Sequence, residues 1–314
     1  MKICIAGAAG AFGMKHLAAV SAIDGVEVVS VVGGEPDDIE AFAKQRGIAH
    51  WTKDLAESLA LDDVEAVILA TPTQLHASQA IQCLEAGKHV MVEIPMADNL
   101  ADSVALVAAQ KQSGLVAMAG HTRRFNPSHQ WIRKRILSGE LTLQHLDVQT
   151  FFFRRTNMNA LGKPRTWTDH LLWHHACHTV DLFQYQTGEQ ASVVQAMQGP
   201  IHDDLKIAMD MSIGMKTPTG KLCTLTLSFN NDGPLGTFFR YICDNGTYIA
   251  RYDDLVDGKE NPIDLSGVAV SSNGIELQDR EFFAAIKEGR EPNGSVAQCL
   301  PAMKTLDALE SVMF

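Results

Sequence analysis

Short apolar segments alternate with helix-like stretches through the first 120 residues. The apolar segments are continuous rather than alternating with polar positions, which is typical of parallel strands buried on both faces. They cover residues 3–6, 26–32, 66–70, 89–92 and 115–119. Helical stretches lie between them near 11–22, 36–46, 75–87 and 98–113. This alternation predicts an α/β domain over residues 1–121, built on a doubly wound parallel sheet.

The pattern changes after residue 121. A helical stretch at 128–138 precedes a β-like run at 146–153, a polar loop at 154–169 and a helix at 170–187. Residues 222–229 alternate apolar and polar positions, which predicts a strand with one buried face. Further strand-like segments lie at 207–214, 237–243 and 247–252, and the chain is helical from about 275. Residues 122–314 are therefore expected to form an α+β domain with a mostly antiparallel sheet.

Composition narrows the classes of partner. The chain of 314 residues has 26 Lys and Arg against 37 Asp and Glu, a formal net charge of −11. Such a balance argues against a nucleic-acid or anionic-membrane partner. No apolar run reaches the length of a membrane span, and the apolar start before Gly7 is too short for a secretory signal. Six scattered cysteines without a Cys-x-x-Cys pair favour a reducing, cytoplasmic location.

A glycine-rich turn follows the first predicted strand. Gly7, Gly10 and Gly13 form a Gly-x-x-Gly-x-x-Gly pattern, one residue longer than the common dinucleotide fingerprint. Glycines at a strand–helix junction let the backbone approach a pyrophosphate, which the N–H groups of the helix start then bind. A simple tight turn is the alternative. The position favours a Rossmann dinucleotide site to which Ala11 and Phe12 also contribute.

The end of the second predicted strand bears on the choice of cofactor. NAD-selective sites usually place Asp or Glu about 20 residues beyond the glycine loop, where it binds the ribose 2′-hydroxyl. Here the chain has Gly33 and Gly34, and Glu35 lies just outside. Without that carboxylate a 2′-phosphate is not repelled, although no Arg is present to bind it. We therefore expect NADP as the preferred cofactor, with NAD accepted.

Several stretches together resemble the Gfo/Idh/MocA oxidoreductase family. They are residues 70–77 (ATPTQLHA), 84–95 (LEAGKHVMVEIP), 124–127 (RFNP), 178–181 (HTVD) and 281–292 (EFFAAIKEGREP). The resemblance implies a nicotinamide cofactor between a Rossmann domain and an open-faced sheet domain that usually forms a homodimer. It also implies further cofactor-binding residues, namely Thr71, Pro72, Thr73, His76, Glu93, Ile94, Pro95 and Trp167.

Within the family, other stretches are similar to members that act on a ring-cleavage product. These are residues 123–127 (RRFNP), 151–155 (FFFRR), 167–178 (WTDHLLWHHACH) and 229–236 (FNNDGPLG). The similarity implies NADP-preferring oxidation of a cyclic hemiacetal to 2-pyrone-4,6-dicarboxylate, after 4,5-cleavage of protocatechuate. Two alternatives are a sugar or inositol dehydrogenase of the same family and a non-catalytic dinucleotide sensor.

Two positions depart from the family pattern. The family usually has Glu-Lys-Pro, and here Ile94 replaces the Lys. The family helix often has Asp-x-x-x-His, and here His174 takes the Asp position while His178 keeps the His. Acid–base roles therefore cannot be copied from relatives with the usual Lys, Asp and His.

The histidine-rich helix is the candidate catalytic element. His174 and His178 are four residues apart and share one face of a regular helix. Histidine suits proton removal near neutral pH, so His178 is the expected general base. Asp181 is expected to fix its tautomer, and His174 to hydrogen-bond the hydroxyl or share the proton. A zinc site lacks an obvious third ligand, so no metal is predicted, and a structural histidine cluster is the remaining alternative.

Arginines in an acidic chain point to an anionic substrate. Arg123 and Arg124 follow the last strand of the first domain, where strand ends usually face a ligand. The expected set for a small di-anionic carboxylate is Arg123, Arg124, Arg154 with its neighbour Arg155, Arg165, His175 and Arg240. Arg240 lies near a strand that could cross a dimer. Guanidinium groups bind carboxylates bidentately, whereas the alternative for each Arg is a solvated surface charge.

Overall fold

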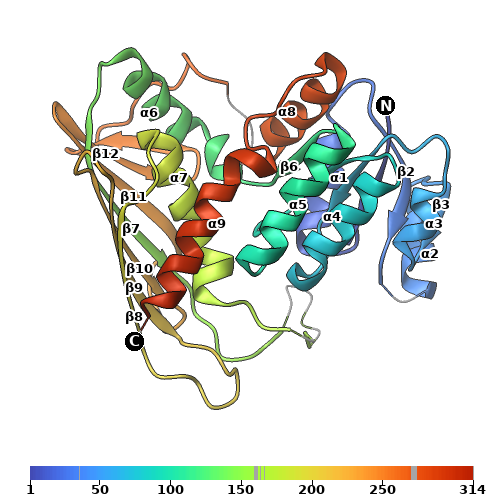
Figure 1. The fold of residues 1–314 in the computed structure, drawn as a ribbon, viewed down its shortest axis with the longest axis horizontal. Coiled ribbons are helices and arrows are strands. Elements are labelled where there is room, and N and C mark those ends of the chain that lie inside the picture. The colour runs from blue at the N-terminus through green and yellow to red at the C-terminus, as the bar shows by residue number, and fades with distance from the viewer. Residues whose placement is uncertain (35, 159–161, 163, 166, 270–273, 314) are drawn as a thin grey trace. The chain divides into compact units, whose positions relative to one another are not determined.

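The chain folds into two compact units. The computed structural model describes residues 1–314 except 35, 159–161, 163, 166, 270–273 and 314 (Figure 1). The first unit is Met1–His121 with Ile275–Leu300, and the second is Thr122–Gly274 with Pro301–Phe314. The predicted division at 121/122 does not include residues 275–300 in the first unit, to which they belong. They belong there because α8 (Ile275–Glu288) packs on α1 (Ala11–Val20) and Ser295 bridges Met118.

The first unit contains a six-stranded sheet in which every pairing is parallel, as the sequence predicts. The strands are β1 (Lys2–Ala6), β2 (Glu27–Val32), β3 (His50–Thr52), β4 (Ala66–Leu69), β5 (His89–Val92) and β6 (Ala117–Ala119). Their order is β3-β2-β1-β4-β5-β6. In this Rossmann order the chain adds strands outward on one side of β1 and then on the other, so the strand order reverses between β1 and β4. Ligands bind beyond the carboxyl ends of strands at such a reversal.

Helices connect these strands. They are α1, α2 (Pro36–Gln45), α3 (Leu55–Leu59), the short 3₁₀ turn η1 (Thr73–Leu75), α4 (His76–Glu85) and α5 (Leu100–Ser113). The expected helices at 11–22, 36–46, 75–87 and 98–113 correspond to α1, α2, α4 and α5. The sequence did not predict β3 or α3, which have three and five residues. No helix among the described residues is long and apolar enough to cross a bilayer.

The second unit contains a seven-stranded sheet in the order β13-β12-β11-β7-β10-β9-β8. The strands are β7 (Leu143–Phe151), β8 (Val193–Gln198), β9 (Asp210–Lys216), β10 (Leu222–Ser228), β11 (Gly236–Cys243), β12 (Gly246–Arg251) and β13 (Asp254–Asp257). Only the central β7–β10 pairing is parallel among these strands. The mostly antiparallel sheet is therefore confirmed, and β8 and β13 are additions to the predicted strands.

The two faces of this sheet differ in polarity. Along β10, Cys223 and Leu225 are buried, whereas Leu222, Thr224 and Thr226 are exposed. The helices α6 (Pro127–Ser138) and α7 (Cys177–Thr187) lie on one side of the sheet, beside its buried positions (Figure 1). Such one-sided coverage is usual for antiparallel sheets and leaves the other face open. The expected open-faced sheet is thus present.

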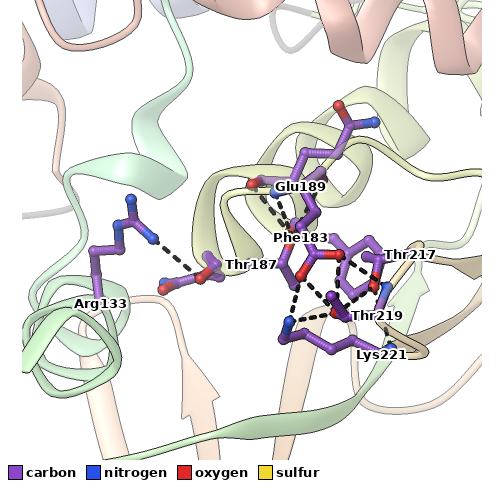
Figure 2. Close-up of polar contacts among 9 residues, drawn as sticks. Arg133, Phe183, Thr187, Glu189, Thr217, Thr219 and Lys221 are labelled. Carbon is purple, nitrogen blue, oxygen red and sulfur yellow. Dashed lines mark hydrogen bonds and ion pairs between the residues drawn. The ribbon is translucent and has the colours of Figure 1, made fainter. Parts of the chain in front are cut away.

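The carboxyl end of α7 is tied to the loop between β9 and β10 (Figure 2). Gly188 ends the helix in the left-handed conformation, and Glu189 then accepts hydrogen bonds from the Thr219 hydroxyl at 2.6 Å and from Lys221. These bonds, with the Lys221 bond first, lower the pKa of Glu189 to about 2. The loop thus anchors one end of the candidate catalytic helix to the sheet.

Candidate active site

The glycine turn after β1 is shaped by two positions that admit no side chain. Gly7 has a φ of +76°, and a Cβ there would lie 2.3 Å from the Ala70 carbonyl oxygen. A Cβ on Gly13 would lie 2.2 Å from the Gly7 carbonyl oxygen. Both distances are far inside van der Waals contact, so the packing of β1 against β4 and α1 requires glycine. The turn is therefore more specific than an ordinary strand–helix connection.

The start of α1 suits a phosphate group. Gly10 occupies the N-cap, and no described side chain caps the helix through a hydrogen bond. Its N–H donates to the Gly7 carbonyl at 2.9 Å, which closes the turn. Ala11 and Phe12 begin the helix, and Phe12 is 48% exposed. Helix N-termini with unsatisfied N–H groups bind phosphates, so these residues fit a dinucleotide pyrophosphate.

The end of β2 presents backbone rather than carboxylate. Gly33 and Gly34 both have positive φ, at +116° and +80°. The Gly33 N–H donates to the Thr52 carbonyl at 3.0 Å, which ties this turn to β3. Glu35, which the sequence places just past the glycines, lies outside the described residues.

The segments after β4 and β5 are cross-linked by a buried histidine. His76 lies 2.8 Å through Nδ1 from the Pro95 carbonyl and 2.8 Å through Nε2 from the Thr71 carbonyl. Burial lowers the pKa of His76, so the neutral ring donates to one carbonyl at a time. Thr71 also donates its hydroxyl to Gln79, while Pro72 and Thr73 form the turn into η1. His76 thus links Thr71 to Pro95, which Ile94 precedes in the chain.

A second buried histidine, which the sequence did not single out, lies under the same edge. His16 of α1 contacts both carboxylate oxygens of Asp279 at 3.0 Å and Oε1 of Glu93 at 2.9 Å. Burial alone disfavours a charged imidazole, but Asp279 and Glu93 outweigh it and raise the pKa of His16 to about 10. We call His16, Glu93 and Asp279 the His16 cluster. It joins α1, the end of β5 and α8.

The candidate catalytic helix begins with a π turn. The sequence predicts one regular helix over 170–187, but Leu171–Ala176 (η3) is π-helical and α7 starts at Cys177. His174 and His178 therefore lie on opposite sides of a π–α junction, and the face-sharing expected from regular α-helical spacing does not apply directly. Such π turns occur often at functional sites.

His174 is held as a neutral hydrogen-bond donor. The backbone N–H of His170 donates to its Nδ1 at 2.9 Å, so the proton of the neutral ring is assigned to Nε2. Burial, followed by the charges of His175 and His170, lowers the pKa of His174 to about 4. Trp167 stacks on the ring with centroids 5.5 Å apart. The geometry therefore opposes proton sharing by His174 and favours donation from Nε2–H.

His178 is the second residue of α7 and is partly buried. Asp181, expected to orient it, accepts a bidentate pair of bonds from Arg124 at 2.8 and 2.6 Å. Both side chains of this pair are almost fully buried, at 4% and 2% exposure. Two of the Arg124 donors are thus used within the second unit, where they link η2 (Thr122–Arg124) to α7.

Two other arginines converge on a residue to which the sequence assigned no role. Asp169 accepts from Arg154 Nη2 at 2.6 Å and from Arg165 Nη1, and its Oδ2 lies 3.5 Å from His175 Nε2. We call these four residues the Asp169 cluster. Burial alone would raise the pKa of Asp169, but His175 and Arg154 hold it well below its usual range. The charged carboxylate had no sequence signal beyond its place in the histidine-rich stretch.

The remaining predicted arginines lie elsewhere. Arg123 is set among the rings of Tyr252 and Phe239, at 4.9 and 5.9 Å, and burial lowers its pKa. Arg240 is exposed on the open face of the sheet, directly across from Asp147 of β7. Its neighbour Phe239 points to the helix-covered face, so Arg240 belongs to the opposite face from the Asp169 cluster.

Arg155 also turns away from the Asp169 cluster. Its Nη1 donates to its neighbour's carbonyl at 2.7 Å and to Asn230 at 3.1 Å. The structure therefore gathers only Arg154, Arg165 and His175 of the predicted substrate set at one carboxylate.

Two family models match different parts of the chain. Residues 1–121 match a family model described as an oxidoreductase family with an NAD-binding Rossmann fold. Residues 127–269 match one described as the C-terminal part of bacterial oxidoreductases.

One full-length relative is the 4-carboxy-2-hydroxymuconate-6-semialdehyde dehydrogenase of Sphingobium sp. (strain NBRC 103272 / SYK-6). It is 64% identical over 99% of this chain and 98% of its own length. The NAD⁺-dependent scyllo-inositol 2-dehydrogenase of Bacillus subtilis (strain 168) is 33% identical over 43% of this chain and 39% of its own. A levoglucosan dehydrogenase solved with NADH shares the fold, with a TM-score of 0.85, 20% identity and coverage of 99% and 96%.

Proposed function

Because the chain belongs to the Gfo/Idh/MocA oxidoreductase family, we propose that it oxidises the cyclic hemiacetal of 4-carboxy-2-hydroxymuconate-6-semialdehyde to 2-pyrone-4,6-dicarboxylate. The observation that carries the proposal is the 64% identity, over almost the whole of both chains, with a dehydrogenase named for this substrate. The Asp169 cluster supports it because Arg154 and Arg165 suit a carboxylate-bearing substrate.

The residues divide the chemical work as follows. Nicotinamide, when bound, accepts the hydride from the hemiacetal carbon. His178 removes the hydroxyl proton as general base, so that the carbon–oxygen bond becomes the lactone carbonyl. His174 donates Nε2–H to a substrate oxygen and stays neutral, in keeping with its Nδ1 partner. This replaces the sharing of a proton between the two histidines.

Three features of the cofactor, assembly and location belong to the same proposal. NADP is preferred, since the described end of β2 offers Gly33 and Gly34 in place of a carboxylate. The chain forms a homodimer through the open face of its seven-stranded sheet, where Val193, Met197 and Leu222 are exposed. The location is cytoplasmic, in keeping with six buried cysteine thiols.

A spectrophotometric assay tests the reaction. Absorbance at 340 nm is followed with NADP⁺ or NAD⁺ and the ring-cleavage product of protocatechuate. Turnover of that product, faster with NADP⁺, is the expected result. Turnover of inositols or aldoses alone would replace the proposed substrate, and binding of dinucleotide without any turnover would indicate a sensor.

Substitution of His178 tests the base. His178→Asn keeps a polar side chain but no titratable group, so kcat is expected to fall by about 10²–10⁴-fold. His202→Asn, a partly buried histidine in a loop of the second unit, is the control and is expected to keep wild-type turnover. Near-normal kcat for His178→Asn across pH 6–9 would refute the assignment.

A further inference from the structure

Some buried hydrogen-bond donors at the Asp169 cluster have no partner among the described residues. They include Arg154 Nη1 and His174 Nε2. A buried donor without a partner costs about 1–3 kcal/mol, so folded proteins usually supply one from protein, water or ligand. Both donors belong to residues grouped around Asp169, since Arg154 binds it directly and Trp167 stacks on His174 beside Arg165.

The character of the leftover groups specifies an anion. Arg154 Nη1 donates and cannot accept, and the tautomer of His174 makes its Nε2 a donor as well. Two guanidinium charges against the one carboxylate of Asp169 leave a single positive charge in excess. That excess matches one further carboxylate.

Aromatic rings fix the two guanidinium planes. The Arg154 guanidinium lies 4.5 Å over the Phe229 ring, and the Arg165 guanidinium lies 5.3 Å from the Trp167 ring. His175 contacts the edge of the same Phe229 ring, with centroids 5.1 Å apart. These ring contacts orient the guanidinium and imidazole donors before a ligand arrives.

We propose that Asp169 is a specificity-determining residue. It holds Arg154 and Arg165 side by side so that their remaining donors, together with Nε2–H of His174, bind one carboxylate of a planar dicarboxylate substrate. Asp169 accepts from both guanidinium groups, through separate carboxylate oxygens. The inference deepens the proposed function and rests on it for the identity of the substrate.

A direct binding experiment tests this without turnover. Pyridine-2,4-dicarboxylate and pyridine-2-carboxylate are titrated calorimetrically into the protein saturated with NADP⁺. A charged hydrogen bond contributes about 1.5–3 kcal/mol, so wild type is expected to bind the dicarboxylate about 10–100-fold more tightly. Arg154→Met and Asp169→Asn are each expected to lose most of that preference, and Asp169→Glu to restore part of it.

The neighbouring arginine provides a matched control. Arg155→Met removes the same charge one residue along, and its contacts are to backbone carbonyls and Asn230. Its affinity for both probes is expected to stay within about twofold of wild type, because electrostatic attraction at a distance is screened by salt. Equal losses in Arg155→Met and Arg154→Met would show that net charge alone, rather than the subsite, attracts the dicarboxylate.

The other outcomes are equally distinct. Unchanged or tighter dicarboxylate binding by Asp169→Asn would overturn the inference, because Asp169 would then compete with the ligand instead of placing its partners. No preference in wild type would overturn the subsite itself. A preference that Asp169→Asn abolishes, in a protein that does not turn over the proposed semialdehyde, would sink the proposed substrate and leave the subsite in place.

Discussion

The His16 cluster lies in the first unit and the Asp169 cluster in the second, and their central charges have opposite signs. The His16 cluster surrounds one cation with two carboxylates, whereas the Asp169 cluster surrounds one carboxylate with two guanidinium groups and a histidine. In the first, His16 and Asp279 are fully buried and every ring nitrogen of His16 has a partner. In the second, the charged side chains are 13–22% exposed. Arg154 Nη1, His174 Nε2 and His175 Nε2 have no hydrogen-bond partner among the residues that the structure describes.

This difference separates a cluster that holds the fold from one that awaits a ligand. In the His16 cluster both ring nitrogens of His16 are already paired, so none is left to bind a substrate. The cluster instead joins α1, the residue after β5 and α8, with His16 and Asp279 263 residues apart in the chain. A cluster with unpaired donors and some access to water retains binding capacity. The two should therefore respond differently to substitution, the first in stability and the second in affinity.

The largest expected effect is the loss of stability in His16→Leu. Removal of the imidazole leaves Glu93 and Asp279 buried without their shared partner, and breaking a buried ion pair costs about 3–5 kcal/mol. Urea denaturation monitored by circular dichroism measures the free energy of unfolding. The double variant His16→Leu with Asp279→Leu removes one stranded carboxylate and should regain part of the loss. If His16→Leu were as stable as wild type, the His16 cluster would not contribute to the stability of the fold.

The next effect is a pH dependence of stability that His16 creates. Its pKa is about 10 in the folded protein against about 6.5 when unfolded, so the stabilisation is fully present below pH 6.5 and is lost as pH rises through 10. The groups that face it are Glu93, which follows β5, and Asp279 of α8. Burial raises the pKa of Asp279, which makes the charged carboxylate less favourable in the folded protein.

The measurement compares wild type with His16→Gln at pH 7 and pH 9.5. Wild type is expected to lose about 3 kcal/mol more than the variant between these values. The difference between the two proteins cancels other titrating groups, which they share. A variant with the same slope as wild type would mean that His16 is neutral in the folded chain.

The contrast between the clusters also shows how far the sequence reaches. Gly7 and Gly13 were predictable because a strand–helix turn needs glycine locally, and the strands of the first unit were predictable from continuous apolar runs. His16 was not singled out because its partner Asp279 is far away in the sequence. Asp169 was not singled out because its partners Arg154 and Arg165 lie in an irregular loop. The π turn at Leu171–Ala176 leaves the hydrophobic pattern of a helix intact, so no periodicity reveals it.

The smallest expected effect is on the stability of Asp169→Asn. The amide keeps the shape of the carboxylate and still accepts a hydrogen bond, while Arg154 and Arg165 are 15% and 22% exposed and can regain water. We expect a loss of about 1 kcal/mol, near the upper range for partly exposed ion pairs. Thermal denaturation with and without pyridine-2,4-dicarboxylate measures it. Stability should fall slightly while the ligand-induced rise in Tm disappears, because a ligand that binds weakly at the concentration used adds little stability to the folded state. A loss as large as that of His16→Leu would make the Asp169 cluster a second structural anchor and erase the contrast between the two units.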